Sequence, residues 1–232
     1  MPPERHEFAD ADSLAAALAV RVGDALKNAI GHAGRAGIAV SGGTTPARFF
    51  KALAGVDLDW PRVEVTLVDE RLVGEDSPRS NARLVRRHLL AGRAGAARFV
   101  PLHVPDDNRH DPLPGAEARL RGMARPFAAV VLGMGTDGHT ASWFADGDRL
   151  GEAIDAGTRQ AVLVMRAASA GEPRITLTLP AVLDTRLLVL HIEGEAKRAA
   201  LERALQPGPA SAMPVRAVLR QSRLPVEVYW SP

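Results

Sequence analysis

The 232-residue sequence contains no cysteine. This absence excludes disulfide bonds, thiolate nucleophiles and zinc sites built on cysteine. The sequence also has no run of eighteen apolar residues, and its N-terminus, MPPERHEFADADSL, lacks the apolar core of a signal peptide. We therefore expect a soluble, cytoplasmic protein that has no membrane partner.

Aromatic residues and an excess of charge of one sign are also scarce. The chain has 29 basic and 27 acidic residues, a formal net charge of +2 and a single tyrosine. Proteins that bind nucleic acid usually carry a basic patch, often interleaved with aromatic side chains. No such block occurs, so nucleic acid is not an expected partner.

Two common catalytic motifs are missing as well. The chain has no GxSxG nucleophile elbow, which argues against a covalent acyl-enzyme. It has no HExxH motif and no comparable group of metal ligands. We therefore expect no metal site.

Short apolar runs alternate with helical patterns along the whole chain. The segment 13–30 has apolar residues at helical spacing, with Asp12 or Ser13 as candidate N-caps and Gly31 after its end. No repeat, low-complexity tract or linker divides the chain, so residues 1–232 are expected to form one domain. The alternation predicts the α/β class, with a mostly parallel sheet and helices on both faces.

The segment 127–142 is the strongest candidate for a functional site. An apolar run over 127–132 predicts a buried strand, and three glycines follow it within six residues. Asp137 and His139 lie in this glycine-rich turn, and 140–142 (Thr-Ala-Ser) is expected to begin a helix. Open α/β sheets bind ligands where their strands end, so the turn is expected to face a ligand.

A second turn, Ser41-Gly42-Gly43-Thr44-Thr45, follows a short apolar strand over 37–40. Pro46 is suited to the first position of a helix over 46–53, and Thr45 is expected to be its N-cap. Free N–H groups at such a turn, together with the helix dipole, favour an anion. The alternative is a tight strand-to-helix turn that binds nothing.

Charged residues follow other predicted strands. The strand expected over 60–68 leads to Asp69-Glu70-Arg71, which forms either a solvated loop or the rim of a site. Ser80 is a candidate N-cap for a helix over 81–90. The strand over 187–192 leads into Glu193-Gly194-Glu195-Ala196-Lys197. Because parallel strands end at one edge, these groups and the two glycine-rich turns are expected to converge.

The polar residues at this edge favour a small phosphorylated metabolite. Arg71, Arg174 and Lys197 are candidate cations for a phosphate group. Arg174 begins an alternating segment, 174–179, that predicts a half-exposed strand. His139 is the best candidate for a general base, and a helix beginning after it would favour the neutral imidazole. The alternative is that His139 only caps its turn.

The most polar and proline-rich stretch is 105–115, which predicts a surface loop. His110 and Asp111 lie in it, but no further ligand stands at a spacing typical of a metal site. A solvated loop is therefore expected there, followed by a short helix over 116–123.

Five motifs in the observed order resemble those of the 6-phosphogluconolactonase family. They span the chain from about residue 37 to 200: Ser41–Pro46, Asp69–Arg71 with Ser80–Asn81, Gly133–Ser142, Pro173–Thr176 and Gly194–Lys197. The related glucosamine-6-phosphate deaminases typically read Asp-Glu-Tyr and Gly-His-Ile-Ala-Phe where this chain has 69–71 and 138–142. The resemblance therefore favours the lactonases and implies their Rossmann-like fold of the sugar-phosphate isomerase/lactonase type.

The resemblance also implies a reaction, the hydrolysis of 6-phospho-D-glucono-1,5-lactone to 6-phosphogluconate without a cofactor. His139 would deprotonate the attacking water, and either Asp69 or Asp137 would orient the His139 imidazole. The oxyanion would form near backbone N–H groups or Arg71. The rival activities are a sugar-phosphate deaminase or isomerase on the same scaffold and a non-catalytic sugar-phosphate sensor.

The binding residues implied by the resemblance lie on the two glycine-rich turns and at two cations. Gly135 and Gly138 belong to the turn of His139. The phosphate would lie on the first turn, with Arg174 and Lys197 as counter-charges. The phosphate turn comprises Ser41, Gly42, Gly43, Thr44 and Thr45. The expected partner is a small phosphorylated sugar lactone, and the expected state is a monomer or a weak homo-oligomer.

Overall fold

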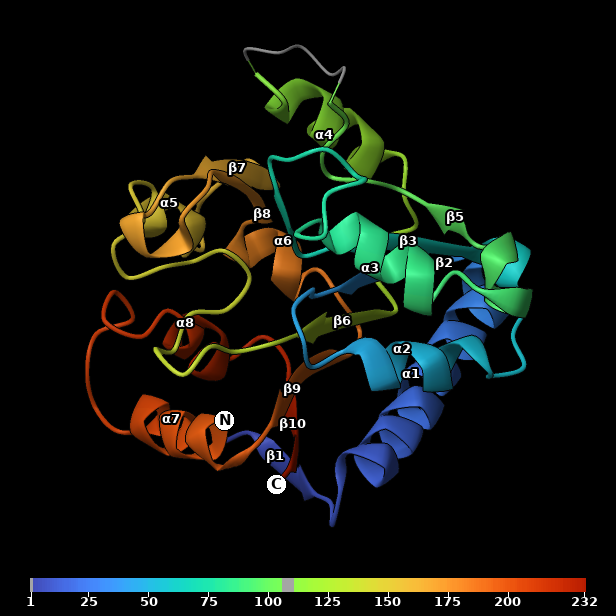
Figure 1. The fold of residues 1–232 in the computed structure, drawn as a ribbon, viewed down its shortest axis with the longest axis horizontal. Helices are drawn as coiled ribbons and strands as arrows, with labels where there is room; N and C mark the ends of the chain where they lie inside the picture. The colour runs from blue at the N-terminus through green and yellow to red at the C-terminus, as the bar shows by residue number, and fades with distance from the viewer. Residues whose placement is uncertain (1, 106–110) are drawn as a thin grey trace.

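The computed structural model describes residues 2–105 and 111–232, and its centre is a parallel sheet (Figure 1). In the described residues seven strands pair in the order β1-β10-β9-β6-β2-β3-β5, every pair parallel. In that order the strands are β1 (Glu4–Glu7), β10 (Val226–Ser231), β9 (Leu188–Glu193), β6 (Ala129–Leu132), β2 (Ala36–Val40), β3 (Val63–Leu67) and β5 (Arg98–Phe99).

Helices cover both faces of this sheet. In Figure 1, α1 and α2 lie on one side of it, and α7 and α8 lie on the other. The α-helices are α1 (Ala11–Ala33), α2 (Ala47–Ala54), α3 (Asn81–His88), α4 (Leu113–Arg121), α5 (Leu150–Ala153), α6 (Leu179–Leu183), α7 (Glu195–Leu205) and α8 (Val215–Leu219). Short 3₁₀ turns occupy Trp60–Arg62, Gly92–Ala96 and Ala168–Ala170. The predicted α/β class, with a mostly parallel sheet and helices on both faces, is confirmed.

The core lies on the central strands. All residues of β2, β3 and β6 are buried. Strands that are buried on both faces read as near-continuous apolar runs, as β2 and β6 do, whereas β3 (VEVTL) also buries Glu64 and Thr66. None of the helices in the described ranges has both the length and the apolar character needed to span a membrane.

A second, antiparallel sheet was not predicted. It pairs β4 (Asp69–Arg71) with β8 (Arg174–Leu177), and β8 with β7 (Val162–Met165). The segment 69–71 is therefore a short strand and not a solvated loop. The expected strand over 60–68 is shorter, because Trp60–Arg62 is a 3₁₀ turn and β3 begins at Val63.

The predicted exposure of the 174–179 segment was also wrong. Every residue of β8 is buried, although polar and apolar residues alternate in it. The polar face turns toward the glycine-rich turn of His139, where the Thr176 hydroxyl accepts a hydrogen bond from the Ser142 N–H (3.2 Å). The alternation thus reflects an internal polar contact and not solvent.

Several boundaries differ from those predicted. Helix α1 (Ala11–Ala33) extends beyond the predicted 13–30 at both ends. Its N-cap is Asp10, whose side chain accepts a hydrogen bond from the Ser13 N–H at 2.7 Å, and its C-cap is Gly34 with φ 75°. Helix α4 begins at Leu113, so the last residues of the expected 105–115 loop are helical. Residues 106–110 of that loop, with His110, lie outside the described residues. Strand β1 was missed because its charged edge sequence has no apolar pattern.

Candidate active site

A cavity of about 200 Å³ opens where the strands of the large sheet end. Four segments predicted to converge contribute to its wall: the first glycine-rich turn, β4, the turn of His139 and the start of α7. Its lining includes the candidate residues Ser41, Gly42, Gly43, Thr44, Thr45, Asp69, Gly135, His139 and Lys197. The other candidates, Arg71, Asp137, Gly138 and Arg174, lie outside this lining.

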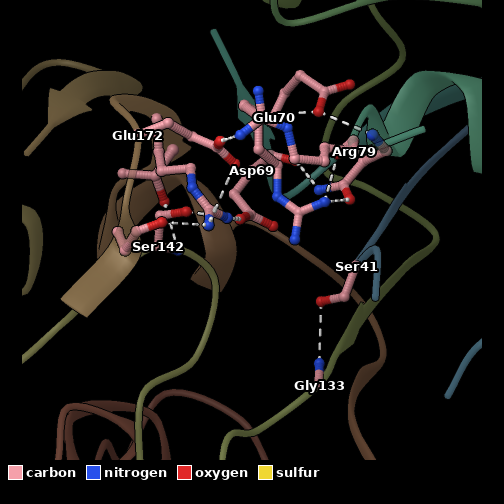
Figure 2. A network of polar contacts seen from close by, with 12 residues as sticks. Ser41, Asp69, Glu70, Arg79, Gly133, Ser142 and Glu172 are labelled. Carbon is pink, nitrogen blue, oxygen red and sulfur yellow. Dashed lines mark hydrogen bonds and ion pairs between the residues drawn. The ribbon is translucent and has the colours of Figure 1, made fainter. Parts of the chain in front are cut away.

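The first glycine-rich turn lines the cavity along its whole length. The Ser41 hydroxyl accepts a hydrogen bond from the Gly133 N–H (2.9 Å), which ties the turn to the end of β6 (Figure 2). A Cβ at Gly42 would lie 1.9 Å from Asn81 Oδ1, so only glycine fits against α3. Within the described chain, the N–H groups of 42–44 have no protein acceptor. They are free to bind an anion.

The prediction that Thr45 is the N-cap of α2 was wrong. Pro46 is the N-cap of α2 and has no side-chain capping bond. The Thr45 hydroxyl instead accepts a hydrogen bond from Lys197 Nζ at 2.8 Å. Burial lowers the pKa of Lys197 from its ordinary value, and the nearby Glu193 opposes that shift. Lys197 thus reaches the turn from the first residues of α7 and brings an ammonium group to it.

The turn of His139 is not followed by the predicted helix. Thr140 pairs with Trp143 in an isolated bridge, and the Thr140 hydroxyl donates to the Gly133 carbonyl at 2.7 Å. The Ser142 hydroxyl donates to Asp69 Oδ2 at 2.6 Å, and Ala141 has a left-handed φ of 49°. These tertiary contacts outweigh the local helix signal. The helix-dipole argument for a neutral His139 was therefore wrong.

Asp137, and not Asp69, contacts His139. The Asp137 carboxylate lies 2.7 Å from His139 Nδ1 and also accepts from the His139 N–H at 3.2 Å. The side-chain hydrogen bond from His139 lowers the pKa of Asp137 to about 2. A carboxylate at Nδ1 selects the tautomer with the proton on Nδ1, which leaves a lone pair on Nε2. The imidazole also packs against Phe144, with ring centroids 4.7 Å apart.

Gly135 makes room for this pair. A Cβ at Gly135 would lie 2.3 Å from His139 Nδ1 and 2.4 Å from Asp137 Oδ1. Gly138 has φ 85°, and a Cβ there would meet Met213. Both glycines are thus required by the shape of the turn, whether or not they touch a ligand.

Asp69 belongs to a buried polar network on the second sheet (Figure 2). It is 6% exposed, accepts from Ser142, and lies 3.9 Å from Arg174 Nη1. Arg71 faces Arg174 across the β4–β8 pair. Burial, followed by the charge of Arg71, lowers the pKa of Arg174. Among the described residues, the buried Nε atoms of both arginines lack hydrogen-bond partners.

Arg71 is hydrogen-bonded to α3 and to the loop that precedes this helix. Its Nη1 donates to Asn81 Oδ1 at 3.1 Å and to the Arg79 carbonyl. Arg174 donates to the Ala170 carbonyl at 3.1 Å. Neither arginine belongs to the lining of the cavity.

Glu70 anchors α3 to β4. Its carboxylate accepts from the N–H groups of Arg71, Asn81 and Ala82 and from the Ser80 hydroxyl, at 2.7 to 3.1 Å. Burial raises the pKa of Glu70, and these hydrogen bonds oppose the shift. Ser80 also caps α3 as predicted, accepting from the Arg83 N–H at 3.2 Å. Glu70 therefore positions the loop and helix beside the cavity.

Sequence reasoning missed His191, a second histidine in the cavity lining. It is 2% exposed, and its Nε2 lies 3.3 Å from Glu193 Oε1. The only signal was a titratable residue inside the otherwise apolar 187–192 run. No group of three or more His, Asp or Glu side chains suited to a metal occurs in residues 2–105 and 111–232.

Comparisons with known proteins place this architecture in a family. A family model described as glucosamine-6-phosphate isomerases/6-phosphogluconolactonase matches residues 9–230. A protein of Mesorhizobium japonicum named 6-phosphogluconolactonase is 52% identical over 97% of this chain and 94% of its own. Another of Rhizobium meliloti with the same name is 47% identical over the full length of both.

A solved structure leads to the same family. The crystal structure of a 6-phosphogluconolactonase from Shewanella baltica is 38% identical, covers 99% of this chain and 98% of its own, and superposes with a TM-score of 0.94. The chain belongs to the glucosamine-6-phosphate isomerase/6-phosphogluconolactonase family.

Proposed function

We propose that this protein hydrolyses 6-phospho-D-glucono-1,5-lactone to 6-phosphogluconate, the second step of the oxidative pentose phosphate pathway. The names of relatives at 47% and 52% identity support this substrate. The observation that carries the mechanism is the His139–Asp137 hydrogen bond of 2.7 Å at a cavity that also contains a free N–H turn and Lys197.

In the proposed mechanism His139 is the general base. Asp137 holds the Nδ1 proton, so Nε2 accepts a proton from the water that attacks C1 of the lactone. The C1 carbonyl becomes a tetrahedral oxyanion. When it collapses, the bond between C1 and the ring oxygen breaks, and the imidazolium returns its proton to that oxygen. No covalent enzyme intermediate is needed.

The remaining candidates bind and orient the substrate. The N–H groups of the 42–44 turn, with Thr45 and Lys197, hold the phosphate as hydrogen-bond donors and a point charge. The oxyanion is stabilised by backbone N–H groups of the two turns. Arg174, whose Nη1 lies 3.9 Å from Asp69 Oδ2, acts through Asp69, and Arg71 acts through the second sheet, where it pairs with Arg174.

The test is a lactone-hydrolysis assay that is coupled to oxidation of the product and corrected for spontaneous hydrolysis. We expect the wild-type protein to exceed the background, and His139→Ala to lower kcat by at least about 10²-fold with the fold intact. A His139→Ala protein with nearly full turnover would remove His139 from the mechanism. Release of ammonia from glucosamine 6-phosphate would instead indicate the deaminase activity, and binding of 6-phosphogluconate without turnover would indicate a sensor.

A further inference from the structure

We propose that His191 binds the phosphate group of the substrate from the floor of the cavity and takes up a proton from solvent when the phosphate enters. The identity of the ligand rests on the proposed function. The placement of His191 does not, because it follows from contacts on β9, β6 and α2.

His191 is the polar member of an apolar floor. Val40, Val131 and Phe50 line the same cavity, from β2, β6 and α2. Leu190 of β9 pairs with Leu132, the last residue of β6, and the residue that follows it is Gly133, which has no side chain. A Cβ built on Gly133 would find only Ser41 Cβ, at 3.8 Å, within 4 Å. His191 is 2% exposed and is part of the cavity lining.

The same ring lies at the phosphate end of the cavity. Its edge packs against Phe49 of α2, with centroids 6.1 Å apart and planes at 78°. Helix α2 follows directly on the 41–46 turn, and Thr45 of that turn is bonded to Lys197. His191 on β9, Thr45 of this turn and Lys197 on α7 all line the same cavity.

Glu193 orients the ring. Its carboxylate is 3.3 Å from His191 Nε2, and this hydrogen bond is the main cause of the lowered pKa of Glu193. The neutral imidazole then carries its proton on Nε2 and leaves Nδ1 without a proton. A phosphate oxygen is an acceptor, so Nδ1 must gain a proton before it can donate to the phosphate.

Charged groups of both signs surround His191. Glu193 lies on the same strand as His191. Arg48 of α2 lies 3.9 Å from Glu193 Oε2 and also forms an ion pair with Asp12 of α1 at 3.2 Å. On β10 the register partner is Tyr229, which is neutral because burial raises its pKa to about 12. Lys197 is the cation from α7. A phosphate dianion adds two negative charges to this set, which stabilises the imidazolium of His191.

The first test follows the ionisation of His191 directly. The imidazole Hε1 resonance of His191 is assigned by its loss in His191→Gln and titrated with pH, without and with saturating inorganic phosphate. We expect phosphate to raise the titration midpoint by about one pH unit, which corresponds to tenfold tighter binding to the protonated form. A midpoint that is the same with and without phosphate would overturn the proposal.

The second test separates binding from a structural role. Gln places its amide near the position of Nε2, so His191→Gln retains a partner for Glu193 but loses the group at Nδ1. We expect KM for the phosphorylated lactone to rise about tenfold and kcat to stay near the wild-type value. A purely structural His191 would be rescued by Gln, and wild-type KM in this variant would contradict the proposal.

The two tests also separate this inference from the proposed function. Inorganic phosphate shifting the His191 midpoint in a protein without lactonase turnover would refute the proposed function and support the role of His191. Turnover above background, with a His191 titration midpoint that phosphate does not shift, would support the proposed function and refute the role of His191.

Discussion

Gly135 determines whether the His139–Asp137 pair can form. Its missing side chain leaves the space in which Nδ1 and the carboxylate meet, since a Cβ would lie 2.3 Å and 2.4 Å from them. We predict that Gly135→Ala displaces the imidazole and lowers kcat by about 10²-fold, as misplacement of a catalytic group by about 1 Å does.

The matched control for this substitution is Gly31→Ala. Gly31 lies within α1, and a Cβ there would meet nothing within 4 Å. It should leave turnover as in the wild type and raise the stability by about 0.5–1 kcal/mol. Full turnover in Gly135→Ala, measured in the same lactone assay, would mean that the pair is not needed.

The low pKa of Asp137 predicts a pH dependence of stability. The hydrogen bond from His139 holds the pKa at about 2, below the ordinary value of 3.8. Because the folded pKa is depressed, the stabilisation is present above about pH 4 and is lost as the pH falls toward 2. Asp137 is 57% exposed, so solvent screening limits the effect to below about 1 kcal/mol.

This prediction is checked by urea unfolding of the wild type and of Asp137→Asn. The stability difference between the two proteins should be larger at pH 6 than at pH 3. An equal difference at both pH values would show that the charge of Asp137 contributes nothing through His139.

Residue chemistry was predicted from the sequence better than residue partners were. His139, Lys197 and the 41–45 turn were predicted to lie near one another, and all of them line the cavity. They could be predicted because residue type and position after a strand are both readable from the sequence. The choice between Asp69 and Asp137 was not readable. It depends on Ser142, which engages Asp69 from a loop bent by an isolated bridge.

At the scale of elements, the β4–α3 connection depends on Glu70. Three backbone N–H groups and the Ser80 hydroxyl converge on one carboxylate that is 3% exposed. We predict that Glu70→Ala destabilises the protein by about 2–5 kcal/mol, because it leaves several buried donors without acceptors. Chemical denaturation gives the value, and reduced turnover should accompany it, because Asp69 precedes Glu70 on β4.

Glu75→Ala serves as the control in the same loop. Glu75 forms an exposed ion pair with Arg86, and such pairs contribute at most about 1 kcal/mol. If both substitutions cost the same, α3 would not be anchored through the Glu70 carboxylate.

Elements with strong periodic patterns were predicted, and those governed by tertiary contacts were not. The buried strands β2, β6 and β9 and the helix α1 follow from apolar spacing. The helix expected after His139 did not form, since the hydroxyls of Thr140 and Ser142 bond to Gly133 and Asp69. The second sheet was hidden because β4 has only three residues, all of them charged.

For the whole molecule, the cavity joins parts of both sheets. The large sheet supplies the two glycine-rich turns and His191, and the second sheet supplies Asp69. A ligand that contacts these parts together binds only the folded chain. Such binding stabilises the entire fold by an amount set by ligand concentration and affinity.

We therefore predict that 6-phosphogluconate raises the melting temperature. At about one hundred times its dissociation constant it contributes about 2.7 kcal/mol, and each kcal/mol shifts the melting temperature of a chain of this size by about 2–4 °C. Gluconate, which lacks the phosphate, should cause a much smaller shift. Lys197→Ala should remove most of the difference between the two ligands, since the ammonium group bonded to Thr45 is the cation of the phosphate turn. Equal shifts with both ligands in the wild-type protein would mean that the 41–45 turn does not hold the phosphate.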